Sequence, residues 1–176
     1  MSDSPLHTLG QHLQQLRLSQ GISLSQLAAD AGIAKSNLSK IEQGKSNPTL
    51  DTMWRIAVQL KVPFGNLVAP IDMTVGDEDF QIRLLDQGGE SPKVDAYWMN
   101  CAANSQHNSE PHLPGTSETI TMIRGQLEVG TDDGCVCLTA GQSYTFSAQQ
   151  PHFYRSGDEG ATCLMAVVYN DPEQHE

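Results

Sequence analysis

The spacing of apolar residues changes once along the chain, close to residue 80, and this change limits the fold more than any other feature. Between residues 6 and 16 the leucines recur every three or four positions, which is the period of an amphipathic helix. From Phe80 onward apolar residues alternate with polar ones, which is the period of a strand. We therefore expect a two-domain chain, with an all-α domain over residues 6–69, a linker over 70–79 and an all-β domain over 80–170.

The all-α part contains the breaks of a helix-turn-helix. Gly21 ends the first predicted helix, and Ser23 with Gln26 forms the capping-box pattern that starts the next one. Gly32 separates that short helix from another that begins near Lys35. Two helices this short bury little apolar surface alone, so the first helix must lie behind them. A further helix and a last short helical turn are expected to close the bundle.

Charge divides the chain at the same place. Residues 1–69 hold six basic and four acidic side chains, a net charge of +2, whereas residues 70–176 hold four basic and 17 acidic ones, a net charge of −13. The first part can approach a polyanion, while the second would be repelled by one and should face away from it. The overall charge of −11 therefore does not exclude nucleic-acid binding.

The second helix of the predicted helix-turn-helix has an outward face suited to DNA. Cations and small polar groups alternate there and in the following loop: Lys35, Ser36, Asn37, Ser39 and Lys40, then Lys45, Ser46 and Asn47. Cations bind phosphates, and amide and hydroxyl groups bind base edges in the major groove. The alternative is a plain helical bundle that contacts proteins, but a merely solvated helix face usually carries more glutamate.

The segment SKIEQGKSNPTLDTMWRIA lies in a stretch, about residues 9–68, that resembles the helix-turn-helix domain of the Cro/C1 (Xre) repressor family. The resemblance implies a lambda-repressor-like bundle of five helices in which residues 24–43 read DNA. It implies base contacts by Lys35, Ser36, Asn37 and Lys40, phosphate contacts at Ser23 to Gln26, and backbone contacts at Lys45 to Asn47. For Glu42 it implies a role in bracing the fold.

The all-β part contains two segments that resemble the motifs of the cupin family. Short strands with frequent turn signals, such as Asp132-Asp133-Gly134, already indicate an antiparallel sandwich or barrel. The residues that fit the cupin motifs are His112, Glu118 and Gly125 in the first and Gly141, Pro151 and His152 in the second. The resemblance covers about residues 80–170 and implies a cupin double-stranded β-helix, a small double-sheet barrel.

The first motif departs from the metal-binding cupin pattern at Pro114, where that pattern has a second histidine. His112, Glu118 and His152 would still form a facial triad able to hold Zn, Fe, Mn or Ni, with His107 as a fourth candidate ligand. The alternatives are a metal-free pocket that uses the same side chains as polar contacts, or no role in binding. Pro114 favours the pocket over a catalytic metal centre.

A pocket in the barrel would be lined by polar and aromatic side chains. The candidate ligand-binding residues are His112, Glu118, Arg124, Tyr144, His152 and Tyr154. Aromatic residues on strands also serve as ordinary core residues, which is the competing role for the two tyrosines.

The expected location is the cytoplasm, without membrane contact. No basic end followed by an apolar run begins the chain, and no apolar run approaches the roughly 18 residues of a membrane span. The four cysteines form no C-x-x-C pair, which favours unpaired thiols in a reducing compartment over a redox role.

Together these patterns predict a one-component transcriptional regulator. Its helix-turn-helix would bind double-stranded operator DNA as a homodimer on a palindromic site, and its cupin domain would bind a small-molecule effector, with or without a divalent metal. The alternative is a metal-dependent cupin enzyme, an isomerase or dioxygenase, fused to a helix-turn-helix. A third alternative, an antitoxin-like binding module, gives the barrel no purpose.

Overall fold

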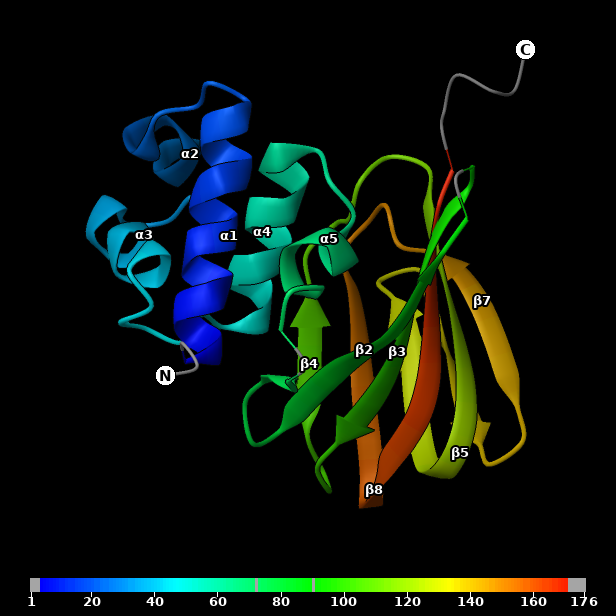
Figure 1. The fold of residues 1–176 in the computed structure, drawn as a ribbon. Coiled ribbons are helices and arrows are strands. Elements are labelled where there is room, and N and C mark those ends of the chain that lie inside the picture. Colours follow the sequence, from blue (N-terminus) through cyan, green and yellow to red (C-terminus); the bar gives the residue numbers. More distant parts are fainter. Residues whose placement is uncertain (1–3, 72, 90, 171–176) are drawn as a thin grey trace. The chain divides into compact units, whose positions relative to one another are not determined.

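The computed structural model describes residues 4–71, 73–89 and 91–170 and divides into two compact units between residues 73 and 74 (Figure 1). The first unit is helical and the second is built of antiparallel strands, as the change in apolar spacing predicted. The division falls inside the expected linker, of which residue 72 lies outside the described residues. Val75–Gly76 forms strand β1, which pairs with β2 (Phe80–Gly88), so the end of this segment belongs to the second unit.

Within residues 4–71 the first unit contains five helices: α1 (Pro5–Ser19), α2 (Leu24–Asp30), α3 (Lys35–Glu42), α4 (Leu50–Leu60) and α5 (Phe64–Val68). Side-chain oxygens of Ser4, Ser23 and Thr49 cap α1, α2 and α4 by accepting hydrogen bonds from backbone N–H groups. The core between the helices consists of fully buried aliphatic residues, including Leu13, Leu27, Leu38, Met53, Ile56 and Leu67. None of the described helices is long and apolar enough to cross a membrane.

Helices α1 and α3 approach each other backbone to backbone at Gly10. A side chain at this position would collide with the carbonyl oxygens of Ile41 and Glu42 at the end of α3. Glycine allows the close approach because it has no Cβ atom. The end of α3 is thereby held directly against α1.

The described part of the second unit contains eight strands, which are β1 and β2 followed by β3 (Lys93–Cys101), β4 (Gln106–Ser109), β5 (Thr116–Thr131), β6 (Gly134–Thr139), β7 (Ser143–Ser147) and β8 (His152–Tyr169). The order along the sheet is β1-β2-β3-β8-β5-β6, with β4 added to β8 and β7 added to β5. All of these pairings are antiparallel, as predicted.

The two long strands β5 and β8 each take part in two layers. The first half of β5 pairs with β7 and the second half of β8, whereas its second half pairs with β6 and the first half of β8. The register shifts between Met122 and Arg124 and again between Gly125 and Leu127. Gly125 has a φ of +79°, and a side chain there would collide with the Gly160 carbonyl. These irregularities let both strands turn from one layer into the other and close a small barrel (Figure 1).

Side chains fill much of the barrel interior. Alternate residues of a strand share a face, and the inward ones are buried, including Tyr97, Met99, Ile120, Met122, Cys163 and Met165. Among these apolar groups stand buried polar residues such as Glu118 and His152. The interior is therefore a packed core with a polar cluster inside it.

Candidate functional sites

The outward face of α3 is exposed and carries no acidic side chain. Lys35, Ser36, Asn37 and Lys40 are exposed, while Leu38 on the opposite face is fully buried. None of these four polar side chains is engaged in a hydrogen bond or ion pair with another residue of the described chain. The groups expected to contact DNA are therefore available to an external partner.

The other predicted DNA contacts, Ser23, Gln26, Ser39, Lys45 and Asn47, are exposed or half-buried. Several make local hydrogen bonds that stiffen this surface. Ser23 accepts from the Gln26 backbone N–H at 3.1 Å. Gln43, which follows α3, donates to Ser39 Oγ at 2.9 Å and accepts from Lys45 Nζ at 2.8 Å. The start of α2 and the loop after α3 are thus held in defined positions on either side of the helix.

A buried ion pair sets the position of α3. Arg17 donates through Nε and Nη2 to the two carboxylate oxygens of Glu42 at 2.7 and 2.8 Å, and through Nη1 to the Ile22 carbonyl at 2.8 Å. The hydrogen bond to Glu42 raises the pKa of Arg17. One guanidinium therefore ties together α1, the α1–α2 turn and the end of α3. This contact gives Glu42 the bracing role that the family resemblance implied.

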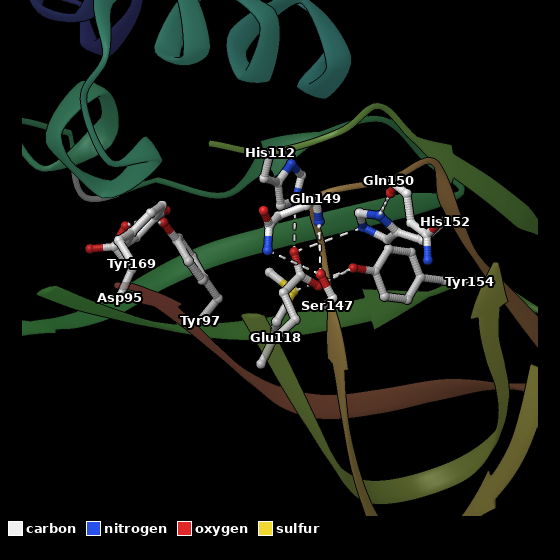
Figure 2. Close-up of polar contacts among 11 residues, drawn as sticks. Asp95, Tyr97, His112, Glu118, Ser147, Gln149, Gln150, His152, Tyr154 and Tyr169 are labelled. Atoms are coloured by element: carbon white, nitrogen blue, oxygen red, sulfur yellow. Dashed lines mark hydrogen bonds and ion pairs between the residues drawn. The ribbon is translucent and has the colours of Figure 1, made fainter. Parts of the chain in front are cut away.

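Three residues from the two cupin-like motifs converge inside the barrel (Figure 2). His112 lies in the loop before β5, Glu118 lies on β5, and His152 begins β8. Their exposed fractions are 5%, 0% and 3%, and one ligand atom from each lies within 4.8 Å of the others. The backbone N–H of His112 donates to the Ala148 carbonyl at 2.8 Å, which holds the loop against the barrel.

Two polar atoms at the centre of this cluster, Glu118 Oε1 and His152 Nε2, are close together but lack regular hydrogen bonds. Glu118 Oε1 lies 2.7 Å from His112 Nε2 and 3.8 Å from His152 Nε2. Apart from the close approach of His112 to Glu118, the atoms Glu118 Oε1 and His152 Nε2 are buried without a hydrogen-bond partner among the described residues. Buried polar atoms are normally satisfied. Two imidazole nitrogens and one carboxylate oxygen are donors that Zn, Fe, Mn and Ni accept, so the cluster fits a divalent metal.

Neighbouring groups hold two members of the cluster in a metal-binding form. The Tyr154 hydroxyl donates to Glu118 Oε2 and so orients the carboxylate. His152 Nδ1 lies 3.0 Å from the Gln150 carbonyl, which can only accept, so Nδ1 carries the proton. The Nε2 atom of the neutral ring then presents its lone pair to the cluster, as a metal ligand must.

The electrostatics of the cluster favour an ionised carboxylate beside a neutral imidazole. Burial opposes ionisation of Glu118, but the imidazoles of His112 and His152 and the Tyr154 hydroxyl outweigh it and lower the pKa of Glu118. Burial lowers the pKa of His152, against the opposing effect of Glu118. Burial also raises the pKa of Tyr154 well above its usual value, so this hydroxyl remains a donor. Anionic oxygen and neutral nitrogen are the forms that bind metals.

The structure places two predicted ligand-binding residues away from the cluster. Tyr144 is half-buried on β7 and stacks on Phe146 with 5.9 Å between ring centroids, and Phe146 in turn lies 5.3 Å from His152. Arg124 is exposed. Strict alternation from Glu118 would have turned Arg124 inward, but the register shift after Met122 breaks the alternation. Arg124 is therefore not part of the cluster, and Tyr144 is separated from it by one ring.

Pro114 and His107 also lie outside the three-residue cluster. Pro114 is exposed in the turn between His112 and β5. His107, on β4, stacks on Phe80 with 4.1 Å between ring centroids. Within the described chain the group of potential metal ligands therefore consists of His112, Glu118 and His152.

A second buried polar group was not predicted from the sequence (Figure 2). Asp95 Oδ2 accepts hydrogen bonds from the hydroxyls of Tyr97 and Tyr169, each at 2.9 Å, and Oδ1 accepts from Gln87 Nε2 at 2.9 Å. The available signal was an aspartate two positions before an aromatic residue on one strand, since such residues share a face. Because its carboxylate is well satisfied, this group is a structural feature of the barrel.

Comparisons with known proteins agree with both units. The family model described as Helix-turn-helix matches residues 13–67. The chain is 33% identical over 163 residues to the HTH-type transcriptional regulator SutR of Escherichia coli (strain K12), covering 89% of this chain and 92% of that protein. It is 26% identical over 188 residues to the HTH-type transcriptional regulator PuuR of the same organism, covering 95% and 97%.

A solved structure resembles the chain over nearly its whole length. It is that of an HTH_3 family transcriptional regulator from Vibrio cholerae, with a TM-score of 0.84 and 27% identity, and the match covers 96% of this chain and all of that one. The enzyme alternative gains no support from these relatives, because their names are those of transcriptional regulators. The protein therefore belongs to the HTH-type transcriptional regulators, with an Xre-type helix-turn-helix domain followed by a unit of antiparallel β-strands.

Proposed function

We propose that this regulator binds operator DNA through the exposed face of α3 and binds a divalent metal ion in the barrel through His112, Glu118 and His152. The metal serves as the effector or as the anchor of a small-molecule effector. The observation that carries the proposal is that Glu118 Oε1 and His152 Nε2 are buried without a hydrogen-bond partner in the described chain. Such atoms lower stability unless a ligand satisfies them.

The residues around the cluster prepare it for a metal. Tyr154 orients the carboxylate of Glu118, and the Gln150 carbonyl fixes the tautomer of His152. Burial of the cluster excludes water and strengthens electrostatic interactions inside it. A divalent ion held by three protein ligands supplies open coordination positions for an oxygen or nitrogen atom of an effector.

The DNA-binding role is divided among the exposed residues of the helix-turn-helix. Lys35 and Lys40 neutralise phosphates, and Ser36 and Asn37 contact base edges, since these are the chemistries each type offers. Ser23, Gln26, Ser39, Lys45 and Asn47 flank the helix and contact the DNA backbone and neighbouring bases. A single domain reads few bases, so we propose a homodimer on a palindromic operator. The effector regulates by binding the DNA-bound and free forms with different affinity.

The DNA contacts are tested with binding sites that the wild-type protein selects from a random pool. Asn37→Ala and Lys40→Ala should each weaken specific binding by about 1–3 kcal/mol without lowering thermal stability. Lys93→Ala, an exposed cation of the β unit, serves as the control and should leave affinity unchanged. Fluorescence anisotropy measures all three. Unchanged operator affinity in both helix variants would show that α3 is not the reading helix.

The metal site is tested on chelator-treated protein reloaded separately with Zn²⁺, Fe²⁺, Mn²⁺ or Ni²⁺. We expect about one ion per chain by elemental analysis and a rise in melting temperature, both lost in His152→Ala. His12→Gln is the matched control, because it removes an imidazole but keeps a donor for the Asn66 carbonyl, 2.7 Å away. Equal metal content in His152→Ala and wild type would reject the site. Operator affinity with and without the bound ion then measures its regulatory effect.

A further inference from the structure

We propose that two copies of this chain pair through the outer face of the β3-β8-β5-β7 layer. This layer outer face is defined by three cross-strand rows: Val94–Val168–Ser117–Ser147, Ala96–Ala166–Thr119–Thr145 and Trp98–Leu164–Thr121–Ser143. The inference rests on the proposed homodimer and names the surface that forms it. Figure 1 shows the strands that carry these rows.

The layer outer face lies opposite the barrel interior. On β5, Glu118 and Ile120 are fully buried, and Thr119 and Thr121, which alternate with them, point the other way. On β8 the buried Met165 alternates with Leu164, which is 38% exposed. These residues therefore present a broad sheet surface that the barrel core does not cover.

None of the twelve residues in the three rows is charged, although residues 70–176 hold 17 acidic side chains. Two copies with a net charge of −13 in this part repel each other across most surfaces. An uncharged face avoids this repulsion. Depletion of charged residues also marks the centre of protein–protein interfaces.

Four of the six hydroxyl groups in the three rows already pair with one another. Thr119 Oγ1 lies 2.8 Å from Thr145 Oγ1, and Thr121 Oγ1 lies 3.0 Å from Ser143 Oγ. Burying a hydroxyl is costly when it loses water and gains no partner. Because these groups pair across the strands, removing them from water leaves their mutual hydrogen bonds intact. The face can therefore be covered at low cost despite its polar residues.

The margins of the layer outer face carry charged residues. Of the four basic residues in this part of the chain, Arg83 pairs in register with Trp98 on one side, and Arg124 pairs with Thr162 beyond the last row. A hollow of about 340 Å³ lined by Thr74, Arg83, Trp98 and Asn100 lies at the Arg83 margin. Asp86 pairs in register with Ala96 and adds an exposed carboxylate to the Arg83 margin. An uncharged centre with a rim of both signs lets cations of one copy meet carboxylates of the other.

A second copy is the occupant that these properties fit. Small residues such as Ala96 and Ala166 allow two sheets to approach closely, as in face-to-face sheet packing. A two-fold axis through the face brings the same patch of both copies together, which is the commonest closed arrangement. A DNA partner is disfavoured by the net charge of −13 of residues 70–176.

The test is sedimentation equilibrium of the full-length chain in the absence of DNA. Leu164→Glu places a new carboxylate in each copy near the interface centre, and we expect the dimer dissociation constant to rise at least about tenfold. Val136→Glu is the matched control, because Val136 is 36% exposed on β6, outside the layer outer face, against 38% for Leu164. The control should dimerise like the wild type.

A second variant keeps the test valid if Leu164→Glu does not fold. Ser143 is exposed, so Ser143→Glu should retain the wild-type melting temperature and still weaken the dimer. A monomeric wild type, unchanged dimerisation in both face variants, or dissociation by Val136→Glu instead would overturn the proposal. Because no DNA is present, a failure of operator binding with an intact dimer would count against the proposed DNA contacts alone.

Discussion

Replacing Arg17 with methionine should lower the free energy of unfolding of the helical unit by about 3–5 kcal/mol. The guanidinium bonds both carboxylate oxygens of Glu42, at 2.7 and 2.8 Å, and the Ile22 carbonyl at 2.8 Å. Methionine fills a similar volume but forms none of these bonds. The Glu42 side chain, only 4% exposed, would then remain buried without its counter-charge.

Most of this loss comes from the stranded carboxylate. Removing one partner of a buried ion pair costs about 3–5 kcal/mol, whereas replacing both partners with apolar residues is often neutral. The missing bond to Ile22 accounts for about 1 kcal/mol of the predicted loss. The double variant Arg17→Met with Glu42→Leu should therefore recover most of the stability and lose less than about 2 kcal/mol relative to wild type.

Urea unfolding of the full chain, followed by tryptophan fluorescence, measures these effects. The chain has two tryptophans, so a Trp98→Phe background leaves Trp54 on α4 to report on the helical unit alone. Arg55→Met is the matched control, because its guanidinium makes long bonds of 3.4 Å to carbonyl oxygens, and it should lose less than about 1.5 kcal/mol. A loss below about 1 kcal/mol for Arg17→Met, or a double variant as unstable as the sum of the single ones, would refute the reasoning.

Two further predictions concern backbone packing and buried thiols. Gly10→Ala should lower the free energy of unfolding by about 2 kcal/mol or more in the same Trp54 assay, because the new Cβ would collide with backbone carbonyls at the end of α3. A variant as stable as the wild type would contradict that contact. Burial raises the pKa of Cys101 to about 12 and also raises those of Cys163 and Tyr97, so the unfolded β unit loses these protons first as pH rises. Its stability should be full below the ordinary thiol pKa of 9.0 and fall above it by up to about 1.4 kcal/mol per pH unit for each group. Thermal unfolding between about pH 7 and 11 checks this, and an equal pH slope after replacing both thiols by alanine would exclude their contribution.

Local signals in the sequence were enough to predict the helical unit. Ser23 caps α2 where the capping-box pattern placed it, and Gly32 separates α2 from α3. Caps and glycine breaks act within a few residues, so they can be recognised without knowing the tertiary structure. The turn at Asp132-Asp133-Gly134, which joins β5 to β6, was predictable for the same reason.

Motif spacing identified the members of the barrel cluster but not all of its surroundings. Tyr154 and Arg124 were equal candidates in the sequence, yet Tyr154 donates to Glu118 and Arg124 is exposed. The difference lies in the irregularity after Met122, which reverses the alternation of β5. Such a shift depends on how β5 pairs with β8, and alternation within one strand does not reveal it.

The sequence by itself determined two folding units of opposite net charge, the exposed residues of the helix proposed to contact DNA, and the histidines and glutamate of the barrel. These follow from local periodicity, turn chemistry and motif spacing. Only the tertiary structure showed that Arg17 reaches Glu42, that Glu118 and His152 meet inside the barrel, and that the uncharged rows of β3, β8, β5 and β7 form one face. Each of these depends on residues far apart in the chain, and their pairing is set by the packing and strand register of the whole domain.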